Sequence, residues 1–377
     1  MGTIKLQNIV KIKKGKKVLE FSNEFVDGAH RYIQIDDLRH DENVKYTSSK
    51  GVEVKKDDVL IAWDGANAGT VGYGLAGLAG STISCLEIVD NKFETAFIGK
   101  CLKSKFRLIR ANCTGATIPH VSRDYLLNLS IPVKSLKEQK QIVLTLDTAD
   151  GLLRKRKEQL KLLDDYLKSV FLEMFGDPVR NEKDIAQKKI GAVGEVVTGN
   201  TPSRQKKEYY GDFIEWIKSD NINTPEFVLT KAEEFLSKIG VEVGRVAPKG
   251  SVLVTSIAGS PDCIGNCAIS DRDVAFNQQI NAFVPGKEIK TEFFFAQLYL
   301  CKRLVQQAST ESMKGMVSKS RFSDIKVLVP KLNEQVEFVR VFNQISGMRK
   351  KMRASLDEMD NHFNALMQRA FRGELHG

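Results

Sequence analysis

The sequence holds three residues whose spacing could support metal-dependent cleavage of a phosphodiester bond. Pro261-Asp262 is followed by Glu288-Ile289-Lys290, a PD…ExK arrangement in which two carboxylates bind Mg²⁺ and a lysine lies beside the attacked phosphate. However, Asp262 lies in the loop sequence AGSPDCIG, and Glu288 follows the turn sequence Pro-Gly-Lys. Solvent-exposed loop charges are therefore the simpler interpretation, and a nuclease that uses Asp262, Glu288 and Lys290 stays as the alternative.

Other patterns of chemical interest lack the surroundings that their chemistry needs. Residues 72–77, GYGLAG, fit the G-x-G-x-x-G dinucleotide fingerprint, but the strand-like STISCLEIV follows instead of a helix. Cys263 and Cys267 could offer two thiolates to zinc, but no second pair of ligands lies at a suitable spacing. The five histidines form no H-E-x-x-H pair. We predict no cofactor, no bound metal and no catalytic activity.

Composition and charge indicate a folded protein with a polyanionic partner. The 377 residues suffice for two or three domains, and 42% hydrophobic with 28% charged residues is typical of folded chains. The formal charge of +10 favours a polyanion as partner. No apolar run reaches the roughly 18 residues that cross a bilayer, and the first residues, MGTIKLQNIVKIKKGKK, do not resemble a secretory signal. We expect a cytoplasmic protein without a membrane partner.

The chain contains an internal repeat. Gly15 of LQNIVKIKKG matches Gly199 of IGAVGEVVTG, 184 residues later, and the same offset pairs YIQIDDL with WIKSDNI. Towards the end of each half, Glu138-Gln139 matches Glu334-Gln335 at an offset of 196, so the second half is about a dozen residues longer. Most of this difference falls between residues 222 and 252. The pair Ser122-Arg123 is matched with Ser320-Arg321, just before the last strand of each half.

Each half is predicted to be a mostly β globule followed by one long helix. Short β-type runs such as VLIAW and SVLVTSIA are separated by Gly, Asn, Asp and Pro. Apolar residues at three- and four-residue spacing predict one short helix over Glu94–Arg110 and another over Glu292–Gln307. The fold class is therefore α+β, in two homologous halves.

The long helices carry heptad repeats that require a partner helix, and the economical partner is the helix of the other half. Arg156 and Arg349 interrupt the two patterns. The predicted interhelical seam consists of Leu146, Leu153, Leu160, Leu163, Leu167, Phe342, Ile345, Met352, Leu356 and Phe363.

Helix-start and helix-stop signals place the boundaries. Pro132 and Pro330 end the preceding strands, Glu138 and Glu334 place negative charge near a helix N-terminus, and Gly176 can cap the first long helix. The predicted organisation is a globule over 1–135, a helix over 136–176, a linker over 177–187, a globule over 188–331, and a helix with the C-terminal tail over 332–377.

Cationic and amide side chains near predicted turns are the candidates for contacting a polyanion. An arginine at either Ser-Arg pair could bind phosphate or the edge of a guanine. Lys218-Ser219-Asp220-Asn221 follows a predicted strand, and Asp36 and Asp220 could instead form turns with their side chains. The candidate set is Gln34, Asp36, Arg39, Ser122, Arg123, Arg204, Lys218, Ser219, Asn221, Lys314, Lys319, Ser320 and Arg321.

The order globule, long helix, globule, long helix resembles the specificity subunits of type I restriction–modification systems. GNTPSRQKKEYYGDFIEWIKSDNIN (199–223) is similar to the opening of a target recognition domain, and FNQQINAFVP to one of its central strands. SIPVKSLKEQKQIV and VPKLNEQVEFV resemble the starts of the two spacer helices. In one departure, the first half has Gly15-Lys16-Lys17-Val18 where the second has Gly199-Asn200-Thr201-Pro202.

This resemblance implies a non-catalytic DNA-recognition subunit. A coiled-coil scaffold that binds nucleic acid without sequence preference stays as a second alternative, beside the nuclease. Each recognition domain is expected to read one half of a bipartite sequence in double-stranded DNA. The helices are expected to lie antiparallel, to set the unread gap and to dock methyltransferase subunits, expected to be two. Restriction and translocating subunits are the further partners. We expect Arg123 and Arg321 to bind phosphate, because a repeated residue suits the common backbone whereas half-sites differ in their bases. The target sequence itself is not readable from the chain.

The heptad seam generates a first prediction, since it is expected to act as a ruler. Inserting one heptad between Lys155 and Lys168, with a matching heptad near Met352 to keep the register, adds about 10 Å at 1.5 Å per residue. We expect the gap of the methylated motif to lengthen by about three base pairs, with partial loss of binding from the altered rotation. Sequencing of methylated sites measures the gap, and an unchanged gap would contradict the ruler.

Overall fold

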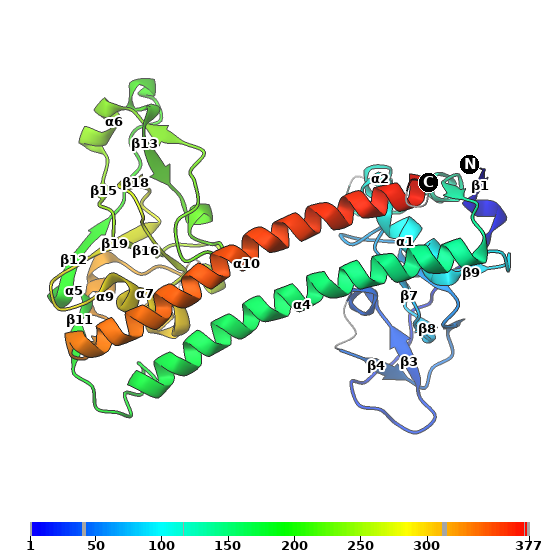
Figure 1. Ribbon diagram of the computed structural model, residues 1–377, viewed down its shortest axis with the longest axis horizontal. Helices are drawn as coiled ribbons and strands as arrows, with labels where there is room; N and C mark the ends of the chain where they lie inside the picture. Colours follow the sequence, from blue (N-terminus) through cyan, green and yellow to red (C-terminus); the bar gives the residue numbers. More distant parts are fainter. Residues whose placement is uncertain (1, 40–42, 116, 311–314, 373, 375–377) are drawn as a thin grey trace. The chain divides into compact units, whose positions relative to one another are not determined.

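The computed structural model of the chain describes residues 2–39, 43–115, 117–310, 315–372 and 374. Two compact units are present, residues 1–157 with 355–377, and residues 158–354 (Figure 1). The long helices α4 (Leu136–Phe175) and α10 (Leu332–Arg372) each contribute residues to both units. Within the described residues, no helix is long and apolar enough to cross a membrane.

The first unit contains two four-stranded sheets and a two-stranded ribbon. The strand orders are β2-β9-β6-β7, β4-β3-β8-β5 and β1-β10. Its elements are β1 (Thr3–Lys5), η1 (Leu6–Asn8), β2 (Val10–Lys14), β3 (His30–Ile33), η2 (Ile35–Leu38), β4 (Lys45–Thr47), β5 (Val52–Val54), β6 (Val59–Ala62), β7 (Val71–Tyr73), β8 (Gly77–Ala79), β9 (Ile83–Ile88), α1 (Thr95–Ser104), α2 (Phe106–Ala111), α3 (Arg123–Leu127) and β10 (Ser130–Pro132).

The second unit repeats this topology. Its strand orders are β12-β19-β16-β17, β14-β13-β18-β15 and β11-β20, and β13 runs parallel to β18 as β3 does to β8. Its elements are β11 (Gln187–Lys189), α5 (Ile190–Val193), β12 (Gly194–Thr198), η3 (Lys207–Tyr209), β13 (Tyr210–Ile217), η4 (Ser219–Asn221), β14 (Phe235–Leu236), α6 (Lys238–Val243), β15 (Val246–Ala247), β16 (Val252–Thr255), η5 (Pro261–Cys263), β17 (Cys267–Ile269), β18 (Val274–Phe276), β19 (Ile280–Pro285), α7 (Thr291–Leu300), α8 (Arg303–Gln306), α9 (Lys319–Asp324) and β20 (Lys326–Leu328).

The repeat and the α+β class predicted from the sequence are therefore confirmed. Helix α6 accounts for part of the extra length of the second half, in the interval where the sequence places it. The corresponding connection in the first half, residues 48–51, is described throughout and holds no helix. In Figure 1, α5, α7 and α9 lie beside the first part of α10, and β13, β18 and α6 lie on the far side of the same unit.

The short helix of each half is broken in two, which the apolar spacing did not predict. Instead of one helix over Glu94–Arg110, α1 ends at Ser104 and α2 begins at Phe106. The Lys105 N–H donates to the Leu102 carbonyl at 3.0 Å, and this three-residue bond tightens the last turn of α1. The second half repeats the break between α7 and α8, at Cys301 and Lys302.

The two long helices are antiparallel, as the packing within each unit shows. In the first unit, Ile142 and Leu146 near the start of α4 share a core with Ala370 near the end of α10. In the second unit, Phe171 near the end of α4 shares a core with Phe338 near the start of α10. Of the predicted seam, Leu146, Leu153, Leu160, Leu167, Phe342 and Ile345 are buried, and Leu163, Met352, Leu356 and Phe363 are half-buried.

Arg349, which interrupts the heptad pattern of α10, is buried, and its guanidinium finds all of its described partners within the second unit. Only 3% of Arg349 is exposed. Its guanidinium forms an ion pair with Asp164 of α4, donates from Nη2 to the Pro225 carbonyl at 2.8 Å, and lies 4.3 Å from the centre of the Phe227 ring. Burial lowers the pKa of Arg349 to about 10. Arg349 therefore joins both helices to the loop that follows η4.

A buried glutamine holds the first turn of each long helix against its globule. Gln139, fully buried, donates from Nε2 to the carbonyls of Lys92 and Lys134 at 2.7 and 2.9 Å and accepts from the Glu94 N–H at 2.8 Å. Gln335 makes the corresponding three bonds in the second unit. The glutamines of the matched Glu-Gln pairs in the sequence are thus the residues that attach each long helix to its globule.

Local capping fixes both ends of α4. Ser135 and Glu138 form a capping box, in which the Ser135 N–H donates to Glu138 Oε2 at 2.9 Å. Hydrogen bonds from Ser135 and Lys134 lower the pKa of Glu138 to about 2. At the other end, Gly176 adopts φ +74°, a left-handed conformation that stops the helix after Phe175.

The glutamine attachment generates a second prediction. Gln335 is fully buried, and Gln335→Leu leaves the Lys290 N–H and the carbonyls of Glu288 and Pro330 without this partner, so we expect a loss of about 2–3 kcal/mol in unfolding free energy. Denaturant unfolding of the full chain measures the change. The control, Gln141→Leu on the exposed side of α4, should change stability by less than about 0.5 kcal/mol. Equal losses in the two variants would contradict the assigned role.

Candidate nucleic-acid interface

The turn after β13 positions three of the predicted contact residues. Lys218 is the N-cap of η4, and its N–H donates to Asn221 Oδ1 at 3.0 Å. Asn221 Nδ2 donates to the Lys231 carbonyl at 3.0 Å, and Ser219 Oγ donates to Gln279 Oε1 at 3.1 Å. Ser219 and Asn221 therefore hold the turn in place, while the ammonium of Lys218 pairs with Glu234, the residue before β14.

The same turn follows β3 in the first unit. The Gln34 N–H donates to Asp37 Oδ2 at 2.6 Å, and Arg39 donates to Asn67 Oδ1. Asp36 is exposed. The suggestion that the side chains of Asp36 and Asp220 form the turns is therefore wrong. The role belongs to the residue one position later, Asp37 or Asn221, because only that side chain reaches back to the cap N–H.

Arg204 lies over an aromatic surface on the loop that follows β12. Its guanidinium is 4.5 Å from the centre of the Tyr210 ring and 4.9 Å from that of Trp216. Nη1 pairs with Glu234 Oε2 at 2.7 Å, so one carboxylate holds both Arg204 and Lys218. The two cations, first Arg204 and then Lys218, lower the pKa of Glu234. Although Arg204 is held on these sides, 54% of its side chain is exposed.

The predicted match between Ser122-Arg123 and Ser320-Arg321 is wrong. Ser122 caps α3 by accepting from the Tyr125 N–H, and Ser318 caps α9 by accepting from the Arg321 N–H, both at 3.3 Å. The capping serine fixes the register, so Ser122-Arg123 corresponds to Ser318-Lys319. A cation at the first helical position, Arg123 or Lys319, is what the two halves share. Both side chains are exposed.

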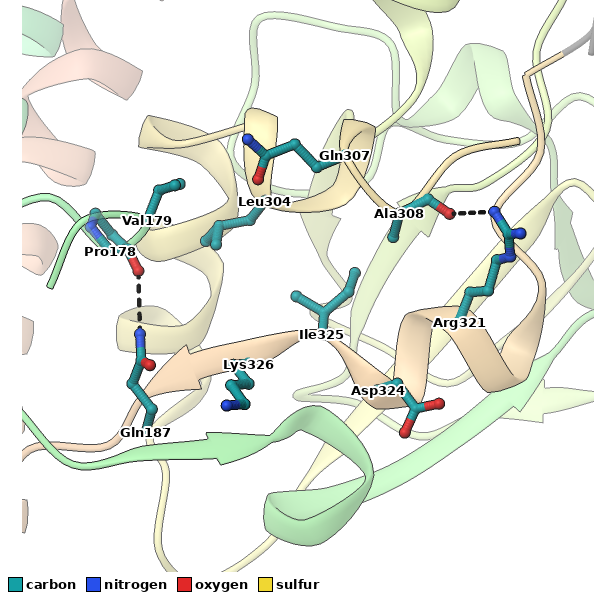
Figure 2. A pocket seen from close by; sticks show the side chains of 10 residues that line it. All are labelled: Pro178, Val179, Gln187, Leu304, Gln307, Ala308, Arg321, Asp324, Ile325 and Lys326. Carbon is teal, nitrogen blue, oxygen red and sulfur yellow. Dashed lines mark hydrogen bonds between the residues drawn. The ribbon is translucent and has the colours of Figure 1, made fainter. Parts of the chain in front are cut away.

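Arg321 instead borders a cavity beside the linker of the second unit (Figure 2). Its Nη1 donates to the Ala308 carbonyl at 3.3 Å, and Ser320 Oγ lies 3.2 Å from Ser318 Oγ. The cavity, of about 500 Å³, is lined by the linker residues Pro178, Val179 and Gln187 together with Leu304, Gln307, Ala308, Arg321, Asp324, Ile325 and Lys326. The remaining candidate, Lys314, lies outside the described residues.

The structure does not bring together the residues of the nuclease alternative. Strand β16 pairs antiparallel with β19, with Thr255 opposite Ile280. Asp262 follows the Thr255 end of this pair, whereas Glu288 follows the opposite end. Glu288 forms an ion pair with Lys188 at 2.8 Å. Over the described part of the chain, no group of three or more His, Cys, Asp or Glu residues is placed to hold a metal ion.

The long helices carry an apolar surface that the heptad analysis missed. Leu144 and Leu152 of α4 are 69% and 53% exposed in the first unit, and Leu162 and Tyr166 are 59% and 56% exposed in the second. They occupy positions outside the seam, but their spacing of four or eight residues is a signal that could have found them. In the first unit, Leu152 also borders a groove of about 330 Å³ lined by Ala149, Met359, His362, Phe363, Ala365, Leu366 and Arg369.

Comparison with known proteins assigns the family. A family model described as the type I restriction modification DNA specificity domain matches residues 1–162 and 182–356, one stretch for each half of the repeat. The chain belongs to this family. The resemblance identified in the sequence is therefore confirmed.

Related proteins and structures of this family span nearly the whole chain. The specificity subunit of the type I restriction enzyme MjaVIII from Methanocaldococcus jannaschii is 24% identical, with 99% of this chain and 92% of that protein covered. For the EcoBI specificity subunit of Escherichia coli the figures are 24%, 99% and 85%. The crystal structure of a type I S subunit from M. genitalium matches with a TM-score of 0.57 at 16% identity, covering 98% of this chain and 96% of that one. This last likeness concerns the fold.

Proposed function

We propose that this chain recognises a bipartite sequence in double-stranded DNA as the specificity subunit of a type I restriction–modification complex, without catalysis of its own. The observation that carries the proposal is the twofold occurrence of one globule, with identical strand orders, on a pair of antiparallel helices. Residues 1–135 and 188–331 are the two recognition domains in this proposal. Residues 136–176 and 332–377 supply the spacer helices, and 177–187 the linker.

General properties of DNA support this assignment. Two similar modules suit two half-sites on a duplex, and their spacing sets the separation of the half-sites. The formal charge of +10 supplies affinity for phosphates that does not depend on sequence, to which base contacts add selectivity. Arg123 and Lys319, the cations that recur after the capping serines, are the phosphate contacts in this proposal.

A subunit that reads cellular DNA works in the cytoplasm.

Methyltransferase subunits, two in number, are the proposed partners on the helices, with restriction and translocating subunits joining the complex. The exposed apolar residues of α4 support this docking role, because apolar side chains of this size gain free energy when a partner covers them. The groove beside Leu152 offers one such site in the first unit.

Reconstitution tests the proposed function. The purified chain alone should neither methylate nor cut DNA, with or without Mg²⁺. With its methyltransferase partner it should methylate one motif made of two half-sites and an unread gap, which sequencing of methylated genomic DNA would show. Methyl transfer or cleavage by the chain alone, or a continuous motif, would contradict the proposal.

Docking on α4 yields a further prediction. Leu152→Glu places a carboxylate in the proposed contact, and burying an unpaired charge there should weaken methyltransferase binding at least about tenfold. The melting temperature of the free chain should change little, because Leu152 is 53% exposed in it. Titration calorimetry measures the affinity.

A control variant separates this effect from net charge. Lys161→Gln lowers the charge by the same one unit at an exposed position, nine residues along α4 and so on its opposite side. It should bind the methyltransferase normally. If Leu152→Glu also binds normally, the groove is not part of the docking surface.

A further inference from the structure

The two globules share the same strand register at one position but carry different side chains there. In the first unit, Tyr32 of β3 lies opposite Lys45 of β4. In the second, the Trp216 N–H of β13 donates to the Glu234 carbonyl at 2.9 Å, which places these two residues opposite each other in the same way. The parallel neighbour confirms the match, since Tyr32 pairs with Leu78 of β8 and Trp216 with Ala275 of β18. Lys45 and Glu234 are therefore equivalent positions with opposite charge.

The N-cap residue of the following turn is the second residue that differs between the two globules. Gln34 and Lys218 are both the N-cap of a 3₁₀ turn. In each turn the N-cap N–H donates to the side-chain oxygen of the residue three positions later. The side chain of each meets that of the residue facing it, Lys45 or Glu234. Lys45 Nζ donates to Gln34 Oε1 at 2.6 Å, and Lys218 pairs with Glu234. Both halves therefore have a contact between the N-cap side chain and the residue that faces it. The donor, the acceptor and the charges differ between the halves.

The third residue that differs between the two globules comes from the loop after β2 or β12. Phe21 packs on Tyr32 with ring centres 5.7 Å apart, and Lys45 Nζ lies 5.1 Å from the centre of the Phe21 ring. In the second unit Arg204 takes this place over Trp216 and pairs with Glu234. We name Phe21, Gln34 and Lys45 the first cluster, and Arg204, Lys218 and Glu234 the second cluster.

This divergence stands out against positions that both halves keep. Gln139 and Gln335 make the same bonds, and Arg123 and Lys319 keep a cation after the capping serine. The sugar–phosphate backbone is the same in both half-sites, whereas the bases differ. Exposed side chains that change on an unchanged frame are therefore suited to bases. Phe21 and Arg204 are 51% and 54% exposed, so a base edge can reach them.

We propose that the two clusters are the base-reading sites of the two recognition domains, and that Arg204 of the second cluster selects a guanine. A planar guanidinium can donate two parallel bonds to guanine O6 and N7. Contact with the Tyr210 and Trp216 rings and the ion pair with Glu234 hold the guanidinium before DNA arrives, which reduces the ordering cost of binding. In the first cluster the Phe21 ring suits the methyl group of thymine.

The space beside the second cluster is consistent with this role. A cavity of about 280 Å³ is lined by Trp216, Lys218 and Glu234 together with Asp220, Asn221, Thr230, Lys231 and Glu233. Two members of the second cluster, Lys218 and Glu234, thus border this cavity. The inference rests on the proposed function, so its test uses the full chain with its methyltransferase partner.

The first arm of the test compares Arg204→Ala with Arg123→Ala across a library randomised in both half-sites, at two salt concentrations. Arg204→Ala should make one position of one half-site degenerate, with a loss of about 5- to 150-fold in discrimination there and an unchanged salt dependence. Arg123→Ala should weaken all sequences evenly and reduce the salt slope by about one unit.

The second arm transplants the first cluster onto the second domain by the triple substitution Arg204→Phe, Lys218→Gln and Glu234→Lys, which leaves the net charge unchanged. The second half-site should change at that position, and the first should stay as it is. The exchange Lys188→Glu with Glu288→Lys reverses another exposed ion pair of the same unit and should leave the motif intact. Arg204→Lys, which keeps the charge but loses the planar fork, decides the question if the triple variant does not fold.

The outcomes separate this inference from the proposed function. An even loss for all sequences with a reduced salt slope in Arg204→Ala would make Arg204 a phosphate contact and overturn the inference. Full discrimination by Arg204→Lys, or an unchanged motif in a folded triple variant, would overturn it as well. In each of these cases the bipartite motif of the wild-type complex would still stand. Absence of any bipartite motif in the wild type would instead remove the proposed function.

Discussion

Neither globule of this chain closes its core with its own strands and short helices alone. In the first unit Leu146 of α4 and Ala370 of α10 are buried among residues of the β-rich part, and in the second unit Phe171 and Phe338 do the same. Burial of apolar area of this size is the main favourable term in folding, so each globule depends on both long helices. The pairing of α4 with α10 is therefore part of both folding units.

Polar attachments make this packing specific. Gln139 and Gln335, both fully buried, tie the start of each helix to backbone groups of the globule. Arg349 lies where Leu153 is found in the first half, and it joins α4, α10 and the Pro225 carbonyl. Removing one member of such a buried network leaves the other charge or dipole unsatisfied, so these few residues determine how the helices meet the two globules.

Comparison of the halves separates residues that serve the frame from residues that serve recognition. The capping serines, the glutamines and the turn-closing side chains Asp37 and Asn221 hold equivalent backbone groups in both units. At a half-buried position facing the same turns, Lys45 is replaced by Glu234, with a reversal of charge. Two half-sites that differ in sequence require a repeat that keeps its backbone structure and varies the side chains around this position.

The sequence by itself determined the repeat, the α+β class, the pair of long helices and the end of α4 at Gly176. These features depend on local chemistry, since heptad spacing, capping boxes and glycine conformation involve residues within a few positions of one another. Contacts between distant residues were decided only by the tertiary structure. The sequence matched Arg123 with Arg321, whereas the capping serines match Arg123 with Lys319. The pairing of Arg204 with Glu234, thirty positions apart, follows from the strand register and the path of the loop. Register is set by how the strands pack into a common core, so no local pattern could reveal that these two side chains meet.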